Sequence, residues 1–462
     1  MSRMGLFSIW KELGFNDNPY SQVTLQADEI GDRLLAGRDQ EIKLLMREIG
    51  DSGAHPSVEG PIGAGKTSMI NVAIYRMQQQ CLEAHAQELY LPADGDFQPD
   101  PDPVKFERDL YFVLAQTLIK YKDQFPKVGL PEPDVRLMDK WLNEYQYTSQ
   151  GGGVGAATLS VQGNYGSEPN PIVTESGFQR NVRQLLRDCF PEGAGGIVCV
   201  MDNLEILQTA GKARDTLDEL RDKVFNIPQV RWVLSGSRGI VSRAKSEKLS
   251  GVMLDPMILE PIDDHAASDA IIRRIREYGT VAALAPVSPD SFDFLYRTFN
   301  RNLREALTRA GEFSRWFHDQ YVNNLDDPIP DDADRDTLVN TWLMEKAELA
   351  NENAGSVRPR HWSFFHALCQ AGGRAGSSEF ARFGFGTAPG LSTAVTDLVN
   401  AQLVVRELDP DNGQKSINSV TPTGWLVSFF HQNFPAADEP ECLVEEYELP
   451  PHAKVLVTTT LR

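Results

Sequence analysis

The sequence has little of what metal centres and disulfide frameworks require. His361 and His366 are five residues apart, a spacing that does not place two side chains on one face of a helix. The five cysteines are scattered, with no CxxC pair and no Cys/His cluster: Cys81, Cys189, Cys199, Cys369 and Cys442. We therefore expect neither a zinc site nor structural disulfides.

Long apolar runs are also missing. No stretch of 18 or more apolar residues occurs, so we expect no membrane partner. The N-terminal segment MSRMGLFSIWKELGF has no uninterrupted apolar core and no small-residue cleavage pattern, so we do not expect it to be a secretory signal. These absences predict a cytoplasmic protein in a reducing compartment.

Positive charge is scarce in the chain. Lysine and arginine number 45 against 65 acidic residues, which gives a formal net charge of −20. Such a charge repels nucleic acid at long range, so any contact with DNA must come from a local basic patch. The 462 residues predict two or three domains, and 41% hydrophobic residues are typical of a folded protein.

Changes in composition and hydrophobic pattern along the sequence predict five parts. Strands alternate with helices from about 56 to 240, which indicates a parallel α/β sheet flanked by helices, interrupted by a glycine-rich insert at 148–170. An acidic, proline-bearing linker is expected from Asp326 to Asp336. The expected parts are an N-terminal segment (1–50), an α/β core (51–255), a helical lid (256–325), a small domain (337–434) and an acidic tail (435–462).

A phosphate-binding loop is the strongest local motif. Its glycines allow backbone N–H groups to turn inward around a phosphate, and the following helix adds the positive end of its dipole. Lys66 is expected to neutralise the β- and γ-phosphates of ATP, and the Thr67 hydroxyl to coordinate Mg²⁺. The nucleotide-binding candidates are Gly60, Pro61, Ile62, Gly63, Ala64, Gly65, Lys66, Thr67 and Ser68.

An acid at the end of a second apolar run is the expected partner of this loop. Residues 197–201 form a continuous apolar strand, as expected for the centre of a parallel sheet, and Asp202 follows it. Asp202 and Thr67 are the predicted Mg²⁺ ligands. The next residue is Asn203, and Glu205 lies three positions beyond Asp202. Either Glu205 is the catalytic base, or hydrolysis is slow and the protein is held in one state by its nucleotide.

Two further segments suggest contacts to the γ-phosphate. The apolar strand 230–234 is followed by Ser235, Ser237 and Arg238, where a polar side chain could sense the phosphate or contact a neighbouring subunit. Arg304 begins a helix of the predicted lid, and arginine suits such a contact because its charge is permanent and its fork can bind two oxygens.

The order of these motifs resembles the initiator clade of AAA+ ATPases, which includes the archaeal origin-recognition proteins, and the related STAND signalling ATPases. The resemblance covers about residues 15–320 and rests on NPY, GRDQEI, GPIGAGKTS, VMDNLE, VLSGSR and FNRNLREAL. It implies an ATPase that forms oligomers, with Arg38 near the adenine and Arg304 as a sensor arginine. The insert at 148–170 and Asn203 depart from the initiator pattern and favour the STAND type.

Residues 360–430 have an order similar to a winged-helix domain. Helices are expected at 362–371, 377–380 and 391–400, then a hairpin with its turn at 409–413. The third helix has no lysine or arginine, and we expect Asp397 to repel DNA. Phosphate contacts could come instead from Arg374, Arg382, Arg406 and Lys415.

Two functions therefore remain open. The first is an ATP-dependent switch that forms oligomers or engages an unidentified protein partner. The second is an ATPase that handles double-stranded DNA through the winged helix. A metabolic kinase is disfavoured because no substrate motif accompanies the loop. A role in defence against viruses or mobile elements is suggested only by analogy with other ATPases that act alone.

Overall fold

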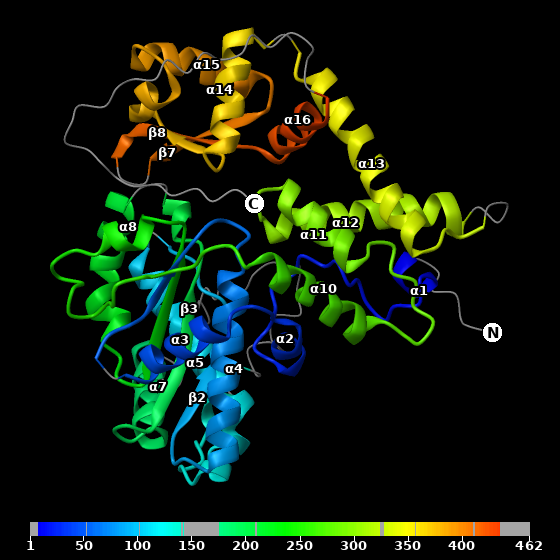
Figure 1. Ribbon diagram of the computed structural model, residues 1–462. Helices are drawn as coiled ribbons and strands as arrows, with labels where there is room; N and C mark the ends of the chain where they lie inside the picture. The colour runs from blue at the N-terminus through cyan, green and yellow to red at the C-terminus, as the bar shows by residue number, and fades with distance from the viewer. Residues whose placement is uncertain are drawn as a thin grey trace, which may run out of the picture.

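The computed structural model describes residues 8–51, 53–100, 102–139, 142, 175–207, 210–323, 328–355, 357–409 and 412–434 (Figure 1). The predicted insert at 148–170 and the acidic tail at 435–462 lie outside these ranges. Within them, every helix is too short or too polar to be a membrane-spanning segment.

The centre of the molecule is an α/β core that the chain enters through three short helices. These are α1 (Ile9–Glu12), α2 (Glu29–Leu34) and α3 (Asp39–Gly50). The core then contains β1 (Ser57–Glu59), α4 (Lys66–Ala84), β2 (Leu89–Pro92), α5 (Pro103–Tyr121), η1 (Lys122–Gln124), η2 (Pro126–Val128), α7 (Glu175–Cys189), β3 (Gly195–Met201), η3 (Leu204–Leu207), α8 (Ala210–Leu220), η4 (Arg221–Phe225), β4 (Val230–Gly236), α9 (Ile240–Ala244) and β5 (Met257–Ile258).

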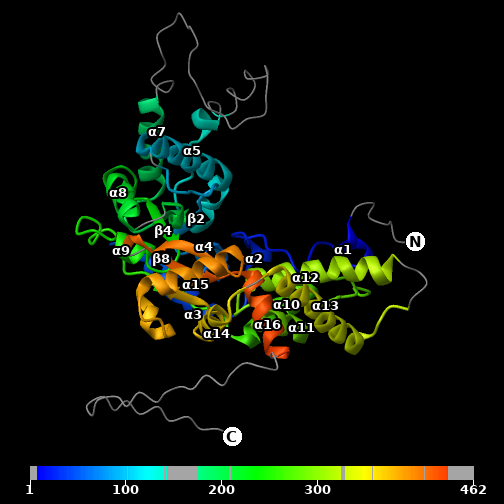
Figure 2. The same cartoon turned by 90° about the horizontal axis from the view of Figure 1, so that it is seen from above.

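The five strands of the core form one parallel sheet in the order β2-β3-β4-β1-β5. Helices cover both faces: α3 and α4 lie on one side, and α5, α8 and α9 on the other (Figure 2). All seven residues of β3 are buried, because a central strand covered on both faces has no solvent side. The predicted parallel α/β sheet is therefore confirmed.

Two glycines at the start of β3 allow this strand to pack closely between β2 and β4. Gly195 has φ +92, and a Cβ there would lie 2.3 Å from the carbonyl oxygen of Leu89 in β2. On the other side, a Cβ on Gly196 would lie 2.3 Å from the carbonyl oxygen of Gln229, just before β4. Only glycine permits both approaches, so this pair fixes the position of the strand that ends at Asp202.

The predicted lid consists of α10 (Asp264–Tyr278), α11 (Pro289–Thr298), α12 (Leu303–Phe317) and η5 (His318–Val322). Side chains cap the starts of these helices: Ser288 accepts a hydrogen bond from the Ser291 N–H, and Asn302 accepts one from the Glu305 N–H. Figure 2 shows the lid helices gathered at one side of the α/β core.

Residues 332–434, here called the C-terminal unit, combine helices with a three-stranded antiparallel sheet in the order β6-β8-β7. The long helix α13 joins the unit to the lid, and the unit lies over the core on the side of α8 (Figure 1). Its elements are α13 (Asp332–Asn353), α14 (Pro359–Gln370), β6 (Arg374–Gly376), η6 (Ser377–Phe383), α15 (Ala388–Asn400), β7 (Val404–Asp409), β8 (Asn412–Val420) and α16 (Pro422–Asn433).

The expected linker from Asp326 to Asp336 is wrong in its second half, because α13 begins at Asp332. The Asp331 carboxylate caps this helix by accepting a hydrogen bond from the Asp334 N–H. Asp332 and Asp334 stand in the first turn, where negative charge interacts favourably with the helix dipole. Acidic residues that suggested a linker thus form the start of a helix.

Two hydrophobic clusters hold these parts together. One fills the α/β core, where Phe97, Phe106 and Phe225 surround the fully buried Trp232 at centroid distances of 5.1 to 5.9 Å. The other runs without interruption from the lid into the C-terminal unit. Phe313 of α12 contacts Trp342 of α13 at 5.7 Å between centroids, so the lid and the C-terminal unit share one core.

Candidate functional site

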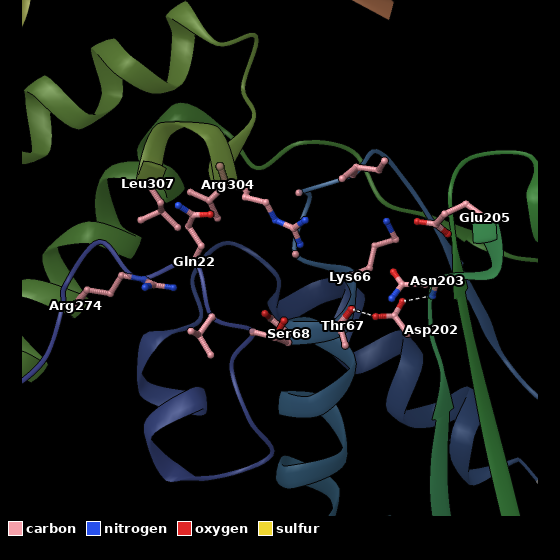
Figure 3. Close-up of a pocket in the computed structure, with 16 residues that line it drawn as sticks. Gln22, Lys66, Thr67, Ser68, Asp202, Asn203, Glu205, Arg274, Arg304 and Leu307 are labelled. Carbon is pink, nitrogen blue, oxygen red and sulfur yellow. Dashed lines mark hydrogen bonds between the residues drawn. The ribbon is translucent and has the colours of Figure 1, made fainter. Parts of the chain in front are cut away.

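A polar pocket of about 260 Å³ lies at the carboxyl ends of the central strands, where α4 begins (Figure 3). It is formed by the phosphate loop, the ends of β3 and η3, the segment before α2, and helices α10 and α12. The residues that line it are Gln22, Val23, Thr24, Ile62, Gly63, Gly65, Lys66, Thr67, Ser68, Asp202, Asn203, Glu205, Arg274, Leu303, Arg304 and Leu307.

Lys66 is folded back over the phosphate loop. Its Nζ donates to the carbonyl oxygens of Gly60 (3.2 Å) and Pro61 (3.1 Å), and the side chain is only 8% exposed. Burial lowers the pKa of the Lys66 ammonium, while the nearby carboxylates of Glu205 and Asp202 act in the opposite direction. Neutral carbonyls are its only hydrogen-bond partners in the described chain, so this buried cation is available to an anionic ligand.

Thr67 and Asp202 meet as neighbouring oxygen groups. The Thr67 hydroxyl donates to the Asp202 Oδ2 at 2.6 Å, and the Asp202 Oδ1 accepts from the Asn203 N–H at 2.9 Å. Mg²⁺ prefers oxygen ligands and is usually held by one or two protein groups together with substrate phosphates. This donor set fits such an ion. Among the described residues no group of three or more His, Cys, Asp or Glu could hold a metal by itself.

Glu205 lies at the end of the pocket beyond Asp202 (Figure 3). Its Oε2 accepts a hydrogen bond from the backbone N–H of Ser237 at 3.2 Å, which ties η3 to the end of β4. Asn203 has φ +59, a backbone conformation that asparagine tolerates better than most residues. Asn203 lies between the end of β3 and the start of η3, so its positive φ belongs to the turn between Asp202 and Glu205.

The lid contacts the phosphate loop directly. A Cβ on Gly63 would lie 2.6 Å from the Asn302 Oδ1 and 3.1 Å from the Arg304 Cβ. Arg304 lines the pocket above the loop (Figure 3), and its charge contributes to lowering the pKa of Lys66. The structure therefore brings Lys66, Thr67, Asp202, Asn203, Glu205 and Arg304 to one pocket.

Two predicted site residues lie elsewhere. Arg38 does not line the pocket: its guanidinium pairs with Glu41 (2.9 Å) and donates to the carbonyl oxygens of Ala64 (3.2 Å) and Glu260 (2.5 Å). These contacts tie Arg38 to the backbone of the phosphate loop, and its position beside the adenine stays a prediction. Arg238 also lies outside the pocket, because it forms an ion pair with Glu260.

The loop residues make different contributions. Ile62, Gly63, Gly65, Lys66, Thr67 and Ser68 line the pocket, whereas Gly60, Pro61 and Ala64 do not. Gly60 and Pro61 instead supply the carbonyls that hold Lys66. Ser235 is fully buried in β4, and its hydroxyl has no hydrogen-bond partner among the described residues. Ser237 reaches the site through its backbone N–H, which donates to Glu205.

Sequence reasoning missed one side of the pocket. Gln22, Val23 and Thr24 come from an irregular segment before α2, and Arg274 and Leu307 come from two lid helices. The only nearby signal was the NPY turn, whose Tyr20 hydroxyl donates to the Val287 carbonyl at 2.8 Å and anchors the segment to the lid. These residues come together only through tertiary contacts, so no local sequence pattern identifies them as pocket residues.

Gly63→Ala is expected to destabilise the nucleotide-free protein by about 1–3 kcal/mol more than Gly65→Ala, because a methyl group at 63 pushes Asn302 from the start of α12. The two glycines share φ +83, but a Cβ on Gly65 would have nothing within 4 Å. The backbone strain is therefore matched, and the difference isolates the contact between loop and lid. Denaturant unfolding measures it, and equal losses in the two variants would contradict the contact.

No protein-family model matches the sequence, and a comparison with curated proteins found no relative. Among solved structures, the Aeropyrum pernix ORC2 protein (ADPNP–ADP complexes) matches with a TM-score of 0.42 and 12% identity, over 91% of this chain and 99% of that one. The Aeropyrum pernix ORC1 protein in complex with DNA gives 0.40 and 13%, over 89% and 98%.

Thermotoga maritima RuvB T158V gives a TM-score of 0.34 and 13% identity, over 86% of this chain and 94% of that one. The fold class itself follows from the parallel sheet, the phosphate loop between β1 and α4, and the acid at the end of β3. The chain has the α/β P-loop NTPase fold.

Proposed function

We propose that this P-loop NTPase binds and hydrolyses ATP as a regulatory ATPase of the AAA+ type, similar to the initiator and STAND proteins. The observation that carries the proposal is the shared pocket in which Lys66, the Thr67–Asp202 pair and Glu205 face Arg304 of the lid. Two cations, Lys66 and Arg304, and the oxygen donors of Thr67 and Asp202 suit a triphosphate with its Mg²⁺.

Each pocket residue has a proposed role in ATP binding or hydrolysis that follows from its position. Lys66 leaves its carbonyl partners for the β- and γ-phosphates, and backbone N–H groups of the loop donate to the same oxygens. Mg²⁺, when bound beside Thr67 and Asp202, supplies charge neutralisation. Glu205 orients the attacking water and accepts its proton, because it is the carboxylate next to Asp202 that is held in place by the Ser237 N–H. Arg304 stabilises the charge that develops on the transferred phosphoryl group.

The proposed output is a change in the C-terminal unit, which we interpret as a winged-helix domain preceded by the helix α13. Support comes from the loop before α12, where Asn300 and Arg301 have φ +51 and +57. Asn302 at the N-cap of α12 and Arg304 in its first turn contact the phosphate loop. On the other side, the Asn300 side chain donates to the Gly372 carbonyl of the C-terminal unit at 3.2 Å. A nucleotide-dependent oligomer or an engaged protein partner is the expected result.

The test is the rate of Mg·ATP hydrolysis, together with the oligomeric state in ATP, in ADP and without nucleotide. A regulatory ATPase should hydrolyse ATP slowly and change its oligomeric state or protease sensitivity with nucleotide. Measurable turnover with no such change would leave an ATPase without the proposed switch, and absence of nucleotide binding would remove the proposal altogether.

One observation favours binding of double-stranded DNA as a second function. Asp397 was expected to repel DNA, but its carboxylate is paired with Arg358 (2.7 Å) and the His361 ring (2.8 Å). The hydrogen bonds from Arg358 and His361 hold the pKa of Asp397 below its usual value, so this carboxylate stays ionised, and the Arg358 guanidinium compensates its charge. This pairing supports the proposal, because a compensated carboxylate repels DNA less than an unpaired one.

The exposed face of α15 is then polar and carries a cation at its side. Ser392, Thr393 and Thr396 are exposed, and the Arg406 guanidinium of β7 lies 3.4 Å from the Ser392 carbonyl oxygen and from the Thr396 hydroxyl. Arg374 is also exposed, whereas Arg382 is paired with Glu379 at 2.7 Å. This arrangement suits phosphate contacts beside a helix that could enter a groove.

Arg406→Ala is expected to weaken binding of a labelled duplex roughly three- to tenfold and to reduce the slope of log affinity against log salt by about 1, because one phosphate contact is lost. Fluorescence anisotropy between about 50 and 200 mM salt measures both quantities. Arg47→Ala, at an exposed arginine of α3, is the control. Wild-type binding that is absent or independent of salt would exclude this second function.

A further inference from the structure

Arg274 is a buried cation that the proposed phosphate chemistry does not use. It belongs to α10 and is only 7% exposed. Its Nη1 donates to the Ser21 carbonyl at 2.8 Å, and no carboxylate pairs with it anywhere in the described chain. Its neighbour Arg273, by contrast, is paired with Asp269 at 2.8 Å. Buried charges are normally paired or bind a ligand, so the free side of Arg274 requires an explanation.

The position of Arg274 suggests which part of a ligand it meets. Figure 3 shows Arg274 at one end of the pocket, beside Gln22 and Leu307, with Asp202 and Glu205 at the opposite end. Lys66, Thr67 and Ser68 lie between the two ends. If the phosphates occupy the loop, with the terminal one toward Glu205, the other end of the molecule must lie against Arg274.

The chemistry of this end suits a nucleobase. A guanidinium carries five N–H donors and no acceptor, and only one donor is used by Ser21. Purine bases offer ring nitrogens as acceptors, which are good partners for such donors. Val23 and Leu307 add apolar surface on which a flat base can lie. Burial lowers the pKa of Arg274, which is consistent with a site that is incomplete without its ligand.

We infer that Arg274 contacts the base of the bound nucleotide by donating to an acceptor nitrogen of the purine ring, and so makes this pocket select a purine nucleotide over a bare polyphosphate. The inference rests on the proposed nucleotide-binding function and adds a residue to it. Arg274 takes no part in the phosphoryl transfer itself.

The test compares dissociation constants for Mg·ATP, Mg·2′-deoxy-ATP and Mg·tripolyphosphate. Arg274→Met is expected to weaken both nucleotides by roughly 10- to 100-fold, the usual effect of removing a hydrogen bond from a charged donor, and to change tripolyphosphate binding less than about twofold. Arg276→Met is the matched control, because Arg276 is exposed on the same helix. Arg274→Lys keeps the charge and provides a second variant if the methionine protein does not fold.

Each other outcome overturns the inference. An equal loss for tripolyphosphate would make Arg274 a phosphate ligand, and a loss confined to ATP but not 2′-deoxy-ATP would assign the contact to the ribose. No loss in either variant would leave Arg274 a structural residue. A wild-type protein that binds none of the three compounds would instead remove the proposed function, so the two failures are distinguishable.

Discussion

Replacing Lys66 with alanine should weaken ATP binding by roughly 100-fold, the effect expected when a buried charge that contacts an anionic ligand is removed, about 3 kcal/mol. The free protein should not lose stability, because Lys66 is buried against neutral carbonyls and its burial already lowers its pKa. The variant therefore separates binding from folding. Calorimetric titration with Mg·ATP measures the loss directly.

Thermal unfolding gives a second measurement of the Lys66→Ala effect. ATP at about 100 times the wild-type dissociation constant should stabilise the wild type by about 2.7 kcal/mol, and the same concentration should stabilise the variant by only about 0.4 kcal/mol. Lys43→Ala, at an exposed lysine of α3, should behave like the wild type. If Lys66→Ala kept the full ATP-dependent stabilisation, the phosphate loop could not be the nucleotide site.

Glu205→Gln should lower the rate of ATP hydrolysis by about 10²- to 10⁴-fold while leaving ATP affinity within about twofold of the wild type. Glutamine keeps an oxygen that can accept the Ser237 N–H, so the side chain can stay in position. It cannot accept a proton from water, so only the chemical step should suffer. Single-turnover hydrolysis beside equilibrium binding separates the two effects.

Glu219→Gln, at an exposed glutamate of α8, is the control for Glu205→Gln. An unchanged rate in Glu205→Gln would exclude Glu205 as the base. Negligible turnover in the wild type itself, with tight ATP binding, would favour a protein held in one state by its nucleotide. The sequence left these alternatives open because Asn203 occupies the position directly after Asp202.

The phosphate loop could be predicted from sequence because its chemistry and its backbone requirements lie in a few consecutive residues. Gly63 and Gly65 supply the positive φ angles, and Lys66 and Thr67 supply the charge and the hydroxyl. Asp202 could be predicted for a similar reason, because an apolar run that ends in an acidic residue can be recognised without tertiary information. The parallel sheet followed from the alternation of strands and helices.

The surroundings of the other site residues could not be predicted, because they depend on contacts between segments that are distant in the sequence. For Arg38 the resemblance predicts a place near the adenine, which stays a prediction. Its contacts with the carbonyls of Ala64 and Glu260 could not be predicted, because no sequence motif marks backbone atoms. Asp397 suggested repulsion of DNA because its partners, Arg358 at the N-cap of α14 and His361 in that helix, are distant in the sequence. Arg274 was overlooked since its isolation from carboxylates is a property of the folded surroundings and not of its helix.

The hydrophobic core that the lid shares with the C-terminal unit has a mechanical consequence. Its packing joins α12, α13 and α16, so these helices should move as one stiff body, with the contact between Asn302 and Gly63 near its pivot. The 22 residues of α13 span about 33 Å. A tilt of about 10° at the pivot would move the far end of an arm of this length by about 6 Å, so a small rotation beside the phosphate loop becomes a displacement of about one helix radius at the far end of α13.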